Sequence, residues 1–406
     1  MFTKFARGIR RASFYTHKRA ESTVASLTKD EILILLRPPF TNWSNVIREA
    51  EKVVGYPTSF MNLRCLLSDE FANMALYLRK LVGTNHLVMQ TAKNVLYGDN
   101  TNLQPWGLII LLLSKSVKNT TPSLTISPKT IEENQRTLAE LTEMIRTGHL
   151  IHKGIINVPF SKRSKDTESA IFGNKIAILL GDYLLVTANG MLASLRNQDI
   201  SYVISSALRD LSEGEFFGDR DEQNMPLPGK PNCGNPKDYY DIHFDTRSIS
   251  IDNVLGNPRK EWTVRTVFNG ASLLGRGCQG AMLLGRQSRE IQNTAYYFGC
   301  HLGLAWQAAS ELQQLTSENK EHFCLASAPV LYALDGNPDL YKIISQAKSD
   351  VKDVDYEDLK FNILKTDAVE RTKVLYEEHA RKATEFIEEI AQNESTEMIK
   401  KLINTF

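Results

Sequence analysis

The side chains of this sequence that could perform chemistry are scattered, and they form no complete catalytic motif. Residues 275–280 read Gly-Arg-Gly-Cys-Gln-Gly, the glycine spacing of a dinucleotide-binding turn. That turn works only where a strand ends and a helix begins, whereas this stretch falls inside a predicted helix, so we interpret its glycines as points of close helix–helix approach. His149 and His152 share one helical face and could ligate a metal, but no third ligand lies near them in the sequence, which favours two ordinary histidines. Motifs of the G-x-S-x-G, H-E-x-x-H and phosphate-loop types are absent from the sequence.

The composition is that of a globular protein. The chain has 406 residues, of which 42% are apolar and 23% charged, so it can build one large domain or two small ones and is not wholly disordered. Its five cysteines include no C-x-x-C pair, which argues against a disulfide scaffold and a cysteine-rich zinc site. The longest unbroken apolar run, Trp106–Leu113, has eight residues, against about 20 for a membrane-spanning helix. We therefore expect no transmembrane segment.

Positive charge is concentrated at the start of the chain. Residues 1–20 contain six basic side chains and no acidic one, and Phe2, Phe5 and Ile9 recur at helical spacing among them. This composition predicts a mitochondrial targeting segment over about residues 1–30, the alternative being a disordered basic terminus. The remaining residues contain 42 basic and 47 acidic side chains, which gives no electrostatic reason to expect nucleic-acid binding.

Past this segment, apolar residues recur at intervals of three and four, which predicts helices. The predicted helices cover residues 131–151, 172–195, 200–211, 264–284, 290–315 and 367–391. Strands do not alternate with helices, so a parallel sheet is not expected. Residues 214–261 are rich in Pro, Gly, Asp and Asn, and we interpret them as an irregular insertion. The expected organisation is one all-α domain over residues 31–406, interrupted by that insertion.

One predicted helix carries a specific resemblance. Residues 172–185 read Phe-Gly-Asn-Lys-Ile-Ala-Ile-Leu-Leu-Gly-Asp-Tyr-Leu-Leu and continue with Val-Thr-Ala, which closely resembles the F-G-N-K-x-A-x-L-x-G-D-x-L-L-x-x-A helix of the trans-isoprenyl diphosphate synthases. Further segments at the family's order and spacing are Leu150–His152, Ala271–Leu273, Leu302–Gln307 and Ala328–Val330. Residues 51–70 resemble in particular the second subunit of the family's heteromeric members. The resemblance extends over about residues 45–406 and implies a helical bundle around a central cavity.

The family's chemistry requires two D-D-x-x-D motifs on facing helices, because carboxylates four residues apart share a face and can bind the magnesium ions that bridge the diphosphate. Both motifs are degenerate in this sequence. The resemblance places Lys153, Gly154 and Asn157 at the first motif, so no carboxylate remains and a cation lies where a metal would bind. At the second motif it places Ser310, Glu311 and Gln314, with one acid where three are expected.

Two further diphosphate contacts of the family are replaced as well. The lysine and arginine that bind isopentenyl diphosphate are exchanged for a stretch containing Thr84, Asn85 and His86. The family's lysine–threonine pair becomes Asn269 and a glycine. Gly148 occupies the position with which the family tunes chain length, five residues before the first motif, and glycine is too small to block a tunnel.

A family fold without its diphosphate contacts implies a non-catalytic role. We expect the non-catalytic subunit of a heteromeric all-trans polyprenyl diphosphate synthase, which elongates farnesyl diphosphate with isopentenyl diphosphate to make the ubiquinone side chain. This chain alone would be inactive and would bind no cofactor or metal. A catalytic subunit would hold Mg²⁺ and would assemble with this chain into a heterotetramer around the growing isoprenoid chain. The complex would lie in the mitochondrial matrix. Peripheral contact with the inner membrane is left open. A stand-alone isoprenoid-binding scaffold and an active prenyltransferase with unusual ligands are the alternatives.

Overall fold

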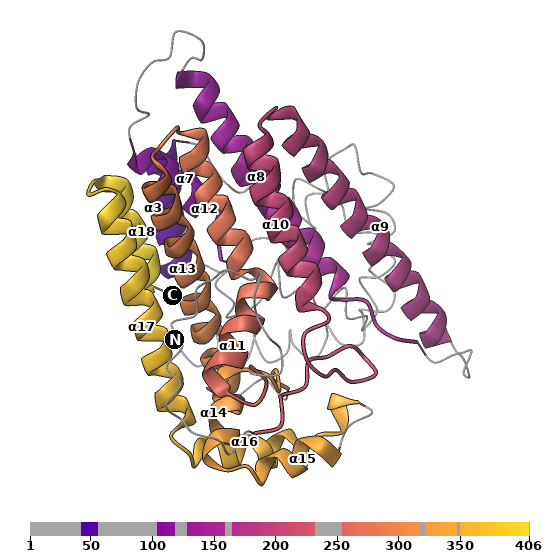
Figure 1. Cartoon of the computed structure of the whole chain (residues 1–406). Coiled ribbons are helices and arrows are strands. Elements are labelled where there is room, and N and C mark those ends of the chain that lie inside the picture. The colour runs from indigo at the N-terminus through magenta and orange to yellow at the C-terminus, as the bar shows by residue number, and fades with distance from the viewer. Residues whose placement is uncertain are drawn as a thin grey trace, which may run out of the picture.

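The computed structural model describes residues 42–55, 104–117, 128–158, 165–231, 254–316, 322–346 and 350–405. Within these ranges the chain is helical and has no strand, apart from an isolated bridge between Arg220 and Pro226. The predicted all-α class is therefore confirmed. The longer helices lie side by side, with the short α14–α16 at one end of the described part (Figure 1).

The helices follow one another with short connections in most of the described ranges. They are α3 (Asn42–Val54), α7 (Trp106–Ser116), α8 (Pro128–His152), α9 (Lys165–Ser194), α10 (Gln198–Gly214), α11 (Pro258–Thr266), α12 (Ser272–Leu284), α13 (Arg289–Thr316), α14 (Ala328–Gly336), α15 (Leu340–Gln346), α16 (Tyr356–Leu364), α17 (Ala368–Ile390) and α18 (Glu394–Thr405). A π-helical turn, Val267–Ala271, joins α11 to α12, and a short 3-10 turn, Val351–Asp353, precedes α16.

The core is built around α13, which packs along α12 and α17. Its Phe298, Leu302 and Trp306 are fully buried. The apolar run Trp106–Leu113 forms α7, which is buried along nearly its whole length among α3, α8, α12 and α18. This run is therefore a core helix, in agreement with its short length.

Glycines allow α12 and α13 to approach closely. A Cβ atom on Gly275 would lie 2.5 Å from Cys300 Sγ, and one on Gly299 would lie 2.7 Å from the Cα of Gly275. A Cβ on Gly277 would likewise meet Ile110 of α7 at 2.6 Å. The interpretation of residues 275–280 as a helix-packing segment is confirmed, because they lie within α12 and their missing side chains make room for neighbouring helices.

The predicted helix over residues 264–284 is interrupted in the structure. Asn257 caps α11 by accepting a hydrogen bond from the Lys260 backbone N–H, and Pro258 takes the first helical position. The π-helical turn then widens the helix and contains Gly270 with φ +156°. A side chain at Gly270 would also lie 2.6 Å from the Trp106 ring. The turn projects Asn269 outward, where it meets the end of α8.

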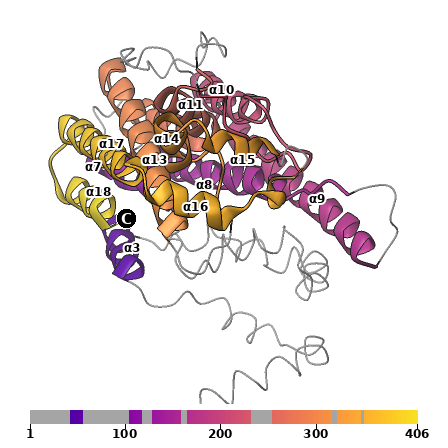
Figure 2. The same ribbon diagram turned by 90° about the horizontal axis from the view of Figure 1, so that it is seen from below.

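The edge helix α9 packs along α8 with one face and projects from the rest of the described bundle (Figure 2). Its segment Ala170–Ser194 is long and apolar enough, by length and composition, to cross a membrane. Polar residues interrupt this segment, so it contains no long unbroken apolar run. About two fifths of its apolar window (39%) is buried, chiefly against α8.

Candidate functional site

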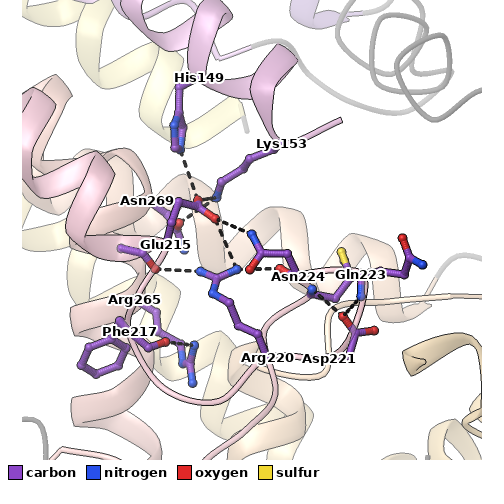
Figure 3. Close-up of polar contacts among 12 residues, drawn as sticks. His149, Lys153, Glu215, Phe217, Arg220, Asp221, Gln223, Asn224, Arg265 and Asn269 are labelled. Atoms are coloured by element: carbon purple, nitrogen blue, oxygen red, sulfur yellow. Dashed lines mark hydrogen bonds and ion pairs between the residues drawn. The ribbon is translucent and has the colours of Figure 1, made fainter. Parts of the chain in front are cut away.

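The residues predicted to correspond to the first motif lie where α8 ends. The helix stops at His152, and Lys153 follows in the turn. Lys153 Nζ donates a hydrogen bond to Asn269 Oδ1 (2.7 Å) and lies 3.3 Å from Glu215 Oε1 (Figure 3). Because Glu215 directly follows α10 and Asn269 belongs to the π-helical turn, one ammonium group connects three elements that are far apart in sequence.

The electrostatics of this cluster centre on Glu215. Its second oxygen, Oε2, lies 3.3 Å from Arg220 Nη1, and its Oε1 lies 3.9 Å from His149 Nε2. Burial lowers the pKa of Lys153, and the charge of Glu215 opposes that shift. Burial and the nearby charge of Lys153 lower the pKa of His149 to about 4. At neutral pH His149 is therefore uncharged, and Glu215 is balanced by Lys153 and Arg220.

Asn157, the third position of the first motif, bonds the same loop. Its backbone N–H donates to Gln223 Oε1 (3.0 Å), and Gln223 Nε2 donates back to the Asn157 carbonyl (3.3 Å). The Asn157 side-chain amide also donates to the Glu222 carbonyl. Two of the three motif positions are thus engaged with residues 215–225.

The residues predicted to correspond to the second motif lie near the C-terminal end of α13. Glu311 is buried, whereas Ser310 and Gln314 are half-buried. Glu311 Oε2 accepts hydrogen bonds from Trp262 Nε1–H and from the Ala328 backbone N–H, both at 2.8 Å, and Oε1 accepts one from Gln307 Nε2 (2.7 Å). Burial raises the pKa of Glu311 to about 7, against the opposing effect of these donors.

The remnants of the two motifs act on one thiol. Burial raises the pKa of Cys324, and the charge of Glu311 adds to that shift while the charge of Lys153 opposes it. The pKa of this buried thiol is therefore influenced from both predicted motif positions.

A buried histidine pair adjoins Glu311 through Trp262. His379 of α17 stacks on Trp262 with ring centroids 6.0 Å apart, and its Nδ1 lies 2.8 Å from Nδ1 of His301 on α13. Burial lowers the pKa of His301 to about 2 and that of His379 to about 3. Both rings are therefore neutral at pH 7, one nitrogen donating and the other accepting, and they connect α13 to α17.

The residues at the two motif positions do not fit magnesium. Magnesium takes oxygen ligands in octahedral geometry, but the first motif supplies an ammonium group, a glycine and an asparagine whose amide is already a donor to Glu222. The one carboxylate of the second motif is enclosed by three donors. No group of three or more His, Cys, Asp or Glu side chains with metal-ligand geometry occurs among the residues that the structure describes.

The other predicted positions are distributed as follows. Gly148 faces α9, and a Cβ there would lie 3.2 Å from the Gly181 carbonyl oxygen and 3.4 Å from Leu184. His152 Nε2 lies 3.4 Å from Asp182 Oδ1 on α9, whereas His149 points toward Glu215. Thr84, Asn85, His86 and the predicted targeting segment lie outside the described residues.

Sequence reasoning missed the partners of these positions. Glu215 and Gln223 fall in the segment interpreted as an insertion, and Trp262 lies next to it. The only sequence signal for Glu215 is an acidic residue just after a predicted helix, an arrangement that is common on solvated protein surfaces. Contacts spanning more than sixty residues, such as Asn157 with Gln223, leave no local pattern.

Comparison with known proteins settles the relationship. A family model described as "Polyprenyl synthetase" matches residues 107–245. The human protein "All trans-polyprenyl-diphosphate synthase PDSS2" is 34% identical over 375 residues, covering 89% of this chain and 86% of that protein. The chain belongs to the polyprenyl synthetase family. A more distant member, the "Probable hexaprenyl pyrophosphate synthase, mitochondrial" of Yarrowia lipolytica, is 25% identical over 456 residues, covering 96% of this chain and 94% of that protein.

Solved structures of the family share its fold. The heptaprenyl diphosphate synthase from Staphylococcus aureus matches with a TM-score of 0.55 at 17% identity, covering 90% of this chain and 98% of that one. The geranylgeranyl pyrophosphate synthase from Bacteroides thetaiotaomicron matches with a TM-score of 0.57 at 15% identity, covering 90% and 99%. The family and the all-α fold inferred from residues 172–185 and the other matching segments are thus confirmed.

Proposed function

We propose that this chain is the non-catalytic subunit of a heteromeric all-trans polyprenyl diphosphate synthase. One observation carries the proposal. Glu311, the single carboxylate at either motif, is buried and accepts bonds from Trp262, Ala328 and Gln307. The first motif instead presents the Lys153 ammonium group, so neither position supplies the open oxygen ligands that a magnesium–diphosphate complex requires.

A catalytic partner would then provide the two aspartate motifs and hold Mg²⁺. The polyprenyl product would become the side chain of ubiquinone, and the complex would be a heterotetramer in the mitochondrial matrix. The acid-free basic segment of residues 1–20 supports mitochondrial targeting, as does the mitochondrial name of the Yarrowia lipolytica relative.

The outer face of α9 is the surface that such a partner would cover. Ile171, Ile178, Leu179, Tyr183 and Val186 are 40–69% exposed, and their spacing places them on one stripe of the helix, away from α8. The same stripe carries exposed Lys175 and Asp182, and exposed apolar residues gathered on one helix face in this way mark interaction surfaces. A partner built on the same fold offers a helix of matching length, whereas a small ligand would leave most of the stripe in water.

The test is incorporation of labelled isopentenyl diphosphate onto farnesyl diphosphate by this chain alone, by the catalytic partner alone and by both co-expressed. Product formed only, or far more, by the pair is the expected result. Turnover by this chain alone would identify an active prenyltransferase with unusual ligands and contradict the proposal. Isoprenoid binding without any effect on a synthase would instead favour a stand-alone scaffold.

A variant that restores only the first motif tests whether both motifs are needed. The triple variant Lys153→Asp, Gly154→Asp, Asn157→Asp should leave the isolated chain inactive, because Glu311 remains enclosed at the second motif and only one half of the metal site is rebuilt. Measurable synthesis by that triple variant alone would count against the proposal.

A further inference from the structure

We propose that the degenerate first motif has become a metal-free latch, in which Lys153 and Asn157 hold the loop of residues 215–225 against the end of α8. The inference concerns contacts within this chain and goes beyond the proposed function. It follows from the fact that the polar groups at two of the predicted motif positions are directed to one loop, as Figure 3 shows for Lys153.

The first half of the latch is the Lys153 ammonium group. It lies between Glu215 Oε1 (3.3 Å) and Asn269 Oδ1 (2.7 Å), so a positive charge stands between two oxygen atoms, as a bound cation would. Arg220 holds Glu215 from the other side and donates to the Gly214 and Asn224 carbonyls, both at 2.7 Å. The Glu215 carboxylate is thereby held at the start of the loop by a contact that does not involve Lys153.

The second half of the latch is the reciprocal pair of Asn157 and Gln223. Each residue donates one hydrogen bond to the other, at 3.0 and 3.3 Å. Asp221 shapes the loop around Gln223, since its Oδ1 accepts bonds from the backbone N–H groups of Gln223 (2.9 Å) and Met225 (2.7 Å). Its Oδ2 accepts one from the Val351 backbone N–H (2.9 Å), which ties the same turn to the segment before α16.

The latch is consistent with the charges around it. His149, which also faces Glu215, has its pKa lowered to about 4 by burial and by Lys153. It is therefore neutral and does not compete with Lys153 for the carboxylate. Lys153 keeps 34% of its side chain exposed, while its ammonium group lies against Glu215 and Asn269.

Hydrogen exchange of the full-length chain tests the latch. Lys153→Met removes the charge and keeps most of the length of the unbranched side chain. We expect it to speed exchange of the amide groups in residues 215–225 by about tenfold while α12 and α13 keep their protection. Lys400→Met is the control, because the Lys400 ammonium group likewise has two side-chain oxygen partners, on Glu388 (2.9 Å) and Glu397 (2.6 Å), but lies on α18, outside this cluster.

A second variant and a magnesium titration complete the test. Asn157→Ala should speed exchange in the same loop, and the double variant should exceed either single one. Unchanged exchange of residues 215–225 in both single variants would overturn the proposal. A slowing of exchange in that loop of the unaltered chain on addition of MgCl₂ would overturn its metal-free character. None of these readouts depends on synthase activity, so they stay informative if the proposed function fails.

Discussion

The buried carboxyl of Glu311 should make the stability of the protein depend on pH in a way that Glu311→Gln removes. Burial raises its pKa from 4.5 to about 7, so the folded chain binds the proton more tightly than the unfolded chain does. Stability from this group is therefore greatest at low pH and is lost as pH rises from about 4.5 to about 7. At about 1.4 kcal/mol per pKa unit, the ionised carboxylate costs about 3 kcal/mol above pH 7, of which about 2.5 kcal/mol appears between about pH 5 and pH 8.

Glutamine suits the site because its carbonyl oxygen can accept the bonds from Trp262 and Ala328. The Gln307 amide can turn so that its oxygen meets the new amide group. Urea unfolding of both proteins at about pH 5 and pH 8 measures the effect, and the variant should gain about 2.5 kcal/mol relative to the unaltered chain over that interval. Equal pH dependence of the two proteins would refute the reasoning.

Glu378→Gln is the control with the opposite sign. Burial raises the pKa of Glu378, but the hydrogen bonds and charges of Arg259 and Lys382 outweigh it and hold the pKa below its usual value. This carboxylate stabilises the fold above its unfolded pKa, and its contribution is lost as pH falls. The control variant should therefore be destabilised most at neutral pH and least in acid.

The remaining predictions concern helix packing and the partner surface. Gly275→Ala should destabilise the fold by about 1–3 kcal/mol, because the new methyl group meets Cys300 Sγ and the Tyr296 carbonyl. Gly190→Ala, at an open position on α9, should instead stabilise the fold by about 0.5–1 kcal/mol. Thermal unfolding measures both effects, and equal changes would contradict the close α12–α13 contact. Leu179→Asp on the α9 stripe should abolish co-purification with a catalytic subunit without loss of helicity. Leu364→Asp, at an equally exposed position on α16, should leave co-purification unchanged. If both variants retain the partner, α9 is not its binding surface.

Much of the fold follows from the spacing of apolar residues. The predicted helices at residues 131–151, 290–315 and 367–391 correspond to α8, α13 and α17 with small shifts of their ends. The π-helical turn in the predicted helix at 264–284 was missed, because one extra residue per turn changes the period only locally. The apolar outer stripe of α9 was missed for a different reason. The exposed apolar residues are interspersed in the sequence with the buried ones that face α8, so the sequence shows no purely polar face that would mark one side of the helix as solvent-exposed.

The site could be predicted only in part. Matching motif positions located Lys153, Asn157 and Glu311, and their residue types already argued against magnesium binding. Their present partners could not be predicted, because Glu215, Gln223 and Trp262 reach them through tertiary contacts that no local spacing encodes. The position of Gly148 relative to the first motif was predicted, but the element that it faces was not. In the structure the absence of a side chain at Gly148 leaves room for the Gly181 carbonyl of α9.

The hydrogen bond that Glu311 accepts from the first N–H group of α14 has an evolutionary consequence. The Glu311 carboxylate satisfies a buried helix terminus and an indole, and withdrawing it would leave those donors unsatisfied at a cost of about 1–3 kcal/mol each. Substitutions that brought back acids at positions 310 and 314 would gain nothing until Glu311 were released, and its release weakens the fold first. Under the proposed non-catalytic role, each substitution path to an active enzyme passes through a less stable chain, which makes the loss of catalysis hard to reverse.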